Sequence, residues 1–75
     1  MSELATRILK VLAGFEIGWS IGEGHLFSTM KEVDPTIVQL YRFPHEVDAA
    51  LKELAKDRFI EKHPIFPDWK ILKTK

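Results

Sequence analysis

Lysine side chains are concentrated toward the C-terminal end of this 75-residue chain, whose net charge is zero. The segment after Arg58 has two acidic residues against four lysines, and it is the only part of the chain with a net positive charge. Ammonium groups bind phosphate oxygens without regard to base sequence. The first candidates for chemistry are therefore Lys62, Lys70, Lys73 and Lys75.

Three further candidates, His45, Lys52 and Lys56, precede this segment at spacings of seven and four residues. Side chains at those spacings share one face of an α-helix. Lys52 could reach a guanine edge or a phosphate, and His45 a phosphate. Acidic residues in the same segment oppose contact with phosphate, and the alternative interpretation is a solvated helix face. These acids are Glu46, Asp48, Glu53 and Asp57.

Catalytic and metal-binding patterns are weak in this sequence. The three histidines are scattered, and His45 with Asp48 supplies only two ligands on one exposed helical turn. The chain has no cysteine, so thiolate ligands and cysteine nucleophiles are excluded. Gly18, Gly22 and Gly24 lack the spacing of a dinucleotide-binding loop. We expect no enzyme, no cofactor and no metal site.

The length and composition predict one globular domain over residues 1–75, because 45% of the residues are apolar. No apolar run approaches the roughly 20 residues of a membrane span, and the N-terminus does not resemble a signal peptide. We therefore expect no membrane association. The lack of cysteine fits the reducing cytoplasm.

The first half of the chain predicts two or three short helices and a strand. Apolar residues at helical spacing predict a helix over about 3–13, with Ser2 as its N-cap. Alternation from Phe15 to Ile21 predicts a short strand, with a looser loop anchored by aromatic residues as the alternative. Gly22 and Gly24 then mark a boundary between elements. Helical spacing returns over 25–33. Asp34 and Pro35 end that segment and begin a two-turn helix over 35–41.

The second half predicts a long helix followed by a β-hairpin. Pro44 begins a helix whose apolar stripe includes Val47, Leu51 and Leu54. Strands are expected over 59–63 and 69–74, joined by a turn over 64–68 that two prolines stiffen. This order predicts an α+β fold with three or four helices, a C-terminal hairpin and an added short first strand.

The run from Val47 to Glu61 resembles the recognition helix and first wing strand of winged helix-turn-helix proteins. The matching features are a β-branched residue followed by Ala-Leu, a further Leu, and an apolar pair plus Glu. The resemblance implies that Val47, Leu51 and Leu54 are core residues and that 64–68 form the wing tip. Many family members have Gly where this chain has Arg58, so we expect Arg58 in a left-handed conformation.

The helix that precedes the recognition helix has two candidates. The segment 25–33 could be that helix, with 35–41 as an inserted turn, as in the long linkers of PadR-type regulators. The segment 35–41 could instead be that helix, with 25–33 as an addition. The Asp34-Pro35 start and the tight turn at Phe43-Pro44 favour the second alternative.

The resemblance implies a protein that binds double-stranded DNA in a transcriptional-regulator-like role. The recognition helix would enter the major groove, and the wing lysines would contact phosphates. The nucleic-acid-binding residues are then His45, Lys52, Lys56, Lys62, Lys70 and Lys73.

The alternative is a winged-helix module that binds proteins without contacting DNA. Large aromatic residues are numerous for so short a chain, and an exposed cluster of them would mark a dimer or partner surface. We expect Trp19 and Trp69 to pack under the wing. Phe43 and Phe66 lie in proline-flanked turns, where full burial is harder.

Overall fold

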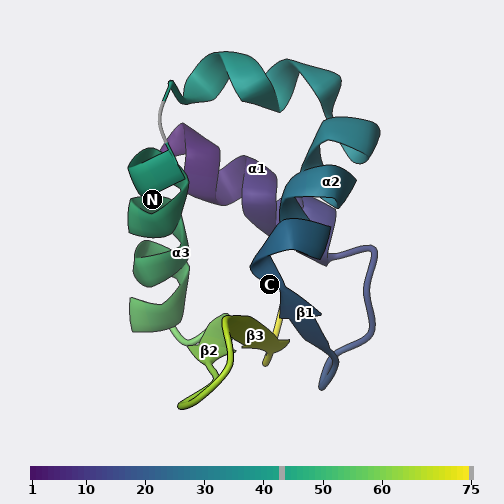
Figure 1. Ribbon diagram of the computed structural model, residues 1–75, viewed down its shortest axis with the longest axis vertical. Helices are drawn as coiled ribbons and strands as arrows, with labels where there is room; N and C mark the ends of the chain where they lie inside the picture. Colours follow the sequence, from purple (N-terminus) through teal and green to yellow (C-terminus); the bar gives the residue numbers. More distant parts are fainter. Residues whose placement is uncertain (43, 75) are drawn as a thin grey trace.

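The computed structural model describes residues 1–42 and 44–74, so Phe43 and Lys75 lie outside the described residues. The described part of the chain forms three α-helices, one 3-10 helix (η1) and three strands (Figure 1). In chain order these are α1 (Glu3–Leu12), β1 (Ser20–Gly22), α2 (Glu23–Val33), η1 (Pro35–Leu40), α3 (Pro44–Lys56), β2 (Ile60–Lys62) and β3 (Asp68–Ile71). The predicted α+β class is confirmed, and the element order is that of a small winged-helix-like fold.

The three strands form one antiparallel sheet in the order β1-β3-β2. β3 is therefore the central strand, although it is the last strand in the chain. Its residue Lys70 stands opposite Ser20 of β1 on one side and Glu61 of β2 on the other. The hairpin β2–β3 is thus joined to the first strand, and the wing is anchored to the body of the domain.

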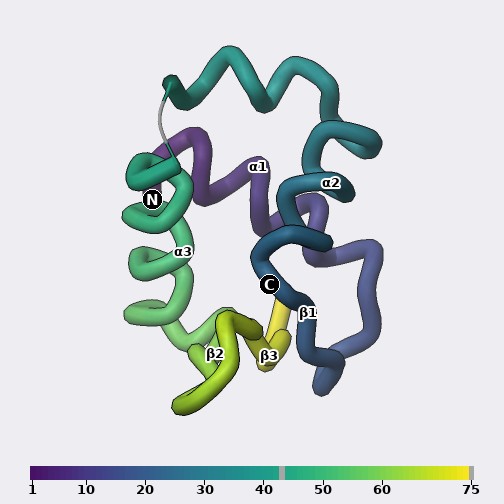
Figure 2. Tube along the Cα trace, in the orientation of Figure 1, coloured from purple at the N-terminus to yellow at the C-terminus, as the bar shows by residue number. Residues whose placement is uncertain are grey.

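The helices surround a core that the sheet closes at one end. In Figure 1, α2 and α3 stand on opposite sides, α1 crosses behind them, η1 spans the top and the sheet lies below. The same path is visible in the tube of Figure 2. Each of these elements contributes side chains to the core. The largest fully buried side chains include Ile8, Leu12, Leu26, Met30, Ile37, Leu51, Leu54, Ile60 and Ile71.

The segment before β1 differs from the prediction. Only Ser20–Gly22 is a strand, and the preceding residues form turns. Gly18 has a φ of 96°, a conformation that non-glycine residues rarely adopt. Its N–H donates to the carbonyl of Ile71 at 2.7 Å, so the chain joins the sheet edge here without a regular ladder. The strand is therefore shorter than the alternation over 15–21 predicted.

α2 begins at Glu23, earlier than predicted, and no loop separates it from β1. Gly22 is the N-cap of α2, and Glu23 and Gly24 form its first turn. The short helix expected over 35–41 is present as a 3-10 helix over Pro35–Leu40. The first alternative for the helix before α3 describes this arrangement better, because α2 directly follows β1 and η1 connects α2 to the segment before α3.

The N-terminal cap of α1 and the C-terminal end of α3 follow the sequence closely. The Ser2 hydroxyl accepts a hydrogen bond from the Ala5 N–H at 3.1 Å. Arg58 has a φ of 62°, so its predicted left-handed conformation is confirmed. The Arg58 N–H donates to the carbonyl of Ala55, and the Phe59 N–H donates to that of Leu54, both at 3.0 Å. This pair of bonds is the Schellman ending of a helix.

The two tryptophans have opposite environments. Trp69 on β3 is 3% exposed and packs in the core, as predicted. Trp19 is 53% exposed, so its predicted burial is wrong. Alternation would place Trp19 on the same face as the buried Ile21, but Trp19 precedes β1, in the irregular segment where the alternation is lost. The wing also differs slightly, since Asp68 already belongs to β3 and the strand ends at Ile71.

None of the helices in residues 1–42 and 44–74 combines the length and the apolar character needed to cross a bilayer. The longest, α3, has 13 residues, whereas a bilayer-spanning helix needs roughly 20.

Candidate nucleic-acid interface

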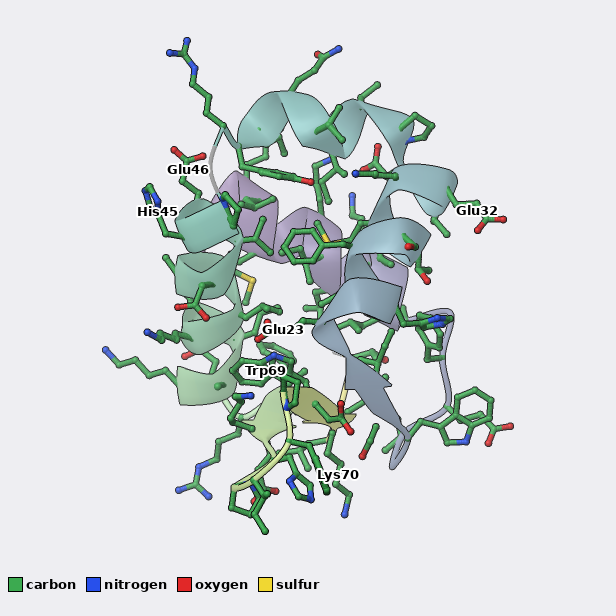
Figure 3. All side chains as sticks on the ribbon, viewed as in Figure 1. Glu23, Glu32, His45, Glu46, Trp69 and Lys70 are labelled. Atoms are coloured by element: carbon green, nitrogen blue, oxygen red, sulfur yellow. The ribbon has the colours of Figure 1, made fainter. Side chains whose placement is uncertain are left out.

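The outer face of α3 carries the predicted recognition residues. His45, Ala49, Lys52 and Lys56 are exposed, whereas Val47, Ala50, Leu51 and Leu54 are buried. The labelled His45 points away from the body of the domain at the start of α3 (Figure 3). The predicted division of α3 into a core stripe and an outer face is therefore correct.

Lys52 is paired with an acid on the same helix. Its ammonium group lies 3.0 Å from the Asp48 carboxylate, one turn earlier, as the spacing predicts. Both side chains are largely exposed, and such pairs contribute little to stability. Phosphate would have to compete with Asp48 for Lys52, so Lys52 is the weaker of the two helix lysines as a phosphate contact.

Two of the acids on α3 are engaged by other parts of the chain. The Glu46 carboxylate accepts a hydrogen bond from the Arg42 N–H at 2.7 Å. The Glu53 carboxylate accepts one from the Ser2 N–H at 2.8 Å and lies 3.6 Å from the N-terminal ammonium group. The Ser2 hydrogen bond lowers the pKa of Glu53. These two carboxylates, predicted to face a groove, instead have donors beside them.

Three cations line one depression where α3 meets the wing. Lys56, Arg58 and Lys62 surround a shallow space of about 480 Å³, together with Ala55, Ile60, Glu61 and Leu72. Among the residues the structure describes, no ion pair involves any of these three cations. Glu61 is the one acid on this lining. Arg58 was missing from the predicted site, although its position between α3 and β2 could have indicated it.

Lys62 is held in place by neighbouring groups on the wing. Its ammonium group lies 5.3 Å from the centre of the Trp69 ring and donates to the Phe66 carbonyl at 3.2 Å. A cation over an indole face is attracted by the ring quadrupole. The Trp69 Nε1–H in turn donates to Glu23 at 3.4 Å, and these two labelled side chains lie close together in Figure 3.

Lys70 and Lys73 do not join this depression. Lys70 alternates with the buried Trp69 and Ile71, so it projects from the opposite face of the sheet. The labelled Lys70 points away from the helices in Figure 3. Lys73 places its ammonium group 4.9 Å from the centre of the Phe59 ring. Lys75 lies outside the described residues. The predicted lysines therefore occupy two faces of the wing.

Within residues 1–42 and 44–74, no three His, Cys, Asp or Glu side chains come together as a metal site. Comparisons of the chain with protein-family models, with curated proteins and with solved structures find no match.

Proposed function

We propose that this chain binds double-stranded DNA through the outer face of α3 and the adjoining wing, in a transcriptional-regulator-like role. The observation that carries the proposal is the depression lined by Lys56, Arg58 and Lys62, at the junction of the two elements. Phosphate contacts by such cations position a protein on the duplex. Exposed side chains on α3, including His45 and Lys52, would then face the groove.

Arg58 adds a conformational argument. A residue with a Cβ in the left-handed region is less stable there than glycine by roughly 1–2 kcal/mol. This chain nevertheless has a cation at that position, next to Lys56 and Lys62. Contact with phosphate would explain why arginine stands at position 58, where the left-handed helix ending favours glycine.

The test is a fluorescence-anisotropy titration of a labelled mixed-sequence duplex at several salt concentrations. Binding should weaken as salt rises, and changing Lys56 and Lys62 together to Ala should reduce the logarithmic slope by about two. Lys70→Ala is the matched control, because Lys70 projects from the other face of the sheet. Absence of binding below about 100 μM at 50 mM salt would reject the proposal, since nonspecific affinities are roughly 10⁻⁴–10⁻⁶ M.

A second candidate function, a protein-binding module, is favoured by a different surface. Trp19 and Ile17 are 53% and 63% exposed, and they adjoin β1, which is an edge strand. Exposed aromatic and aliphatic side chains beside an unpaired strand edge suit a partner protein or a second copy of the chain. Sedimentation of the chain should reveal a concentration-dependent dimer that Trp19→Ser abolishes. A monomer at all concentrations would reject self-association.

A further inference from the structure

The tip of the wing is apolar and exposed. Ile65 is 80% exposed and Phe66 is 58% exposed, and they are flanked by Pro64 and Pro67. Figure 2 shows the loop between β2 and β3 extending away from the helices. Exposed apolar side chains at a projecting tip cost solubility, so an interaction is the natural reason for them.

The tip is also held in one conformation. The N–H groups of Ile65 and Phe66 both donate to Nδ1 of His63 at 3.0 Å, and the Phe66 ring lies 5.0 Å from the His63 ring. The Lys62 ammonium group donates a hydrogen bond to the Phe66 carbonyl, and the His63 N–H donates one to the Asp68 carbonyl at 2.9 Å. Two prolines restrict the backbone further. The apolar tip is therefore organised before any partner binds.

The charge around the tip favours DNA as the partner. No acid occurs between Lys62 and Pro67, although Glu61 and Asp68 border this run, and Lys62 lies at the base of the tip beside Lys56 and Arg58. An apolar point beside cations is complementary to a duplex, whose phosphates flank stacked apolar bases. Apolar side chains, Phe, Ile and Pro among them, insert between base steps from the minor groove and kink the duplex.

We infer that Ile65 and Phe66 form a wedge that enters the minor groove and partly unstacks a base step while Lys56, Arg58 and Lys62 contact the flanking phosphates. This inference rests on the proposed DNA binding and adds a mechanism to it. His63 is a positioning residue, because it orders the tip without touching the duplex. No covalent step is involved.

The experiment compares two duplexes of equal length and base composition. One consists of alternating TA steps, which unstack easily, and the other is a stiff A-tract. The wild-type chain should bind the alternating duplex about tenfold more tightly, which is within the range for one stacked base. Fluorophores at the two duplex ends should report a bend on binding.

Phe66→Ser and Ile65→Ser should bring the two affinities to within about twofold and remove the bend. Val33→Ser is the matched control, because Val33 is 62% exposed, close to the exposure of Phe66, but lies at the end of α2, outside the wing. Circular dichroism would verify that each variant is folded. His63→Ala should reduce the preference while leaving Lys56 and Lys62 able to contact phosphate.

Three outcomes would overturn the wedge and are distinguishable from one another. Salt-dependent binding by the wild type, with no duplex preference and no effect of Phe66→Ser, would reject the wedge and retain the proposed function. No binding to either duplex would reject both. Phe66-dependent binding to vesicles of phosphatidylcholine and phosphatidylglycerol without DNA binding would instead assign the tip to a lipid surface.

Discussion

Arg58 shows how one residue connects the fold to the proposed surface. It ends α3 in a left-handed conformation and places a guanidinium group in the depression beside Lys56 and Lys62. The helix could end equally well on glycine, which adopts this conformation without steric cost. Stability therefore favours glycine at this position, whereas arginine adds a positive charge to the surface of the depression.

Replacing Arg58 with glycine should stabilise the domain. We expect the free energy of unfolding to rise by about 0.5–1 kcal/mol, because relief of the left-handed strain exceeds the added flexibility of the unfolded chain. Arg58→Ala is the control, since it removes the same charge but keeps a Cβ at this φ. Urea denaturation of the two variants would measure the difference. Equal stabilities for Gly and Ala would contradict the prediction.

At the scale of elements, Arg7 of α1 ties that helix to the junction of α2 and η1. Its guanidinium group donates to both carboxylate oxygens of Asp34, at 2.6 and 2.7 Å, and also contacts the Thr36 hydroxyl. The hydrogen bonds from Arg7, and then those from Thr36, lower the pKa of Asp34. The same hydrogen bond raises the pKa of Arg7. Asp34 is the N-cap residue of η1, in keeping with the expected helix start at Asp34-Pro35, but its side chain makes no capping hydrogen bond and serves this connection.

The Arg7–Asp34 pair should make stability depend on pH. Because the folded-state pKa of Asp34 lies below its unfolded value of about 3.9, the stabilisation is complete above that value and is lost as the pH falls through the folded pKa. Asp34→Asn should therefore be less stable than wild type near pH 7. The difference should begin to shrink below about pH 4. Thermal unfolding from pH 7 to pH 2 would measure it.

The matched variant for this measurement is Arg7→Gln. Combined with Asp34→Asn in a double-mutant cycle, it isolates the coupling between the two side chains. The double variant should be little less stable than either single variant. Parallel pH profiles for wild type and Asp34→Asn would show that this pair does not couple α1 to the α2–η1 junction.

At the scale of the whole molecule, the central position of β3 decides which aromatic residues are buried. β3 pairs with both other strands, so Trp69 lies in the middle of the inner face of the sheet. Trp19 precedes the edge strand β1 and is exposed. The Phe15 ring lies 6.5 Å from the Trp19 ring and 6.2 Å from that of His25. The molecule thus has one tryptophan that reports the core and one that reports the surface.

Quenching of fluorescence by acrylamide should separate the two tryptophans. In the native wild type, one component should be quenched readily and one should resist quenching, because Trp19 is exposed and Trp69 is buried. Trp19→Phe should leave only the resistant component, and denaturation should then make that component accessible. A native Trp19→Phe variant quenched as readily as its denatured form would contradict the placement of β3 over the core.

Much of the fold followed from local patterns in the sequence. The α3 stripe, the Ser2 cap, the left-handed Arg58 and the hairpin each depend on residues close together in the chain, where spacing and conformational preference decide the outcome. The outer face of α3, with His45, Lys52 and Lys56, followed from the same periodicity. Alternation failed before Ser20, because the turn at Gly18 interrupts the strand.

By itself, the sequence determined the α+β class, the amphipathic helix α3 and a basic C-terminal segment. Only the tertiary structure decided which charges share a surface. It engaged Glu53 with Ser2, brought Lys56, Arg58 and Lys62 to one depression, and set Lys70 on the opposite face. For the Glu53–Ser2 contact the physical reason is distance along the chain, since the two residues are 51 positions apart. Periodicity assigns a side chain to a face, but the packing of elements determines what that face meets.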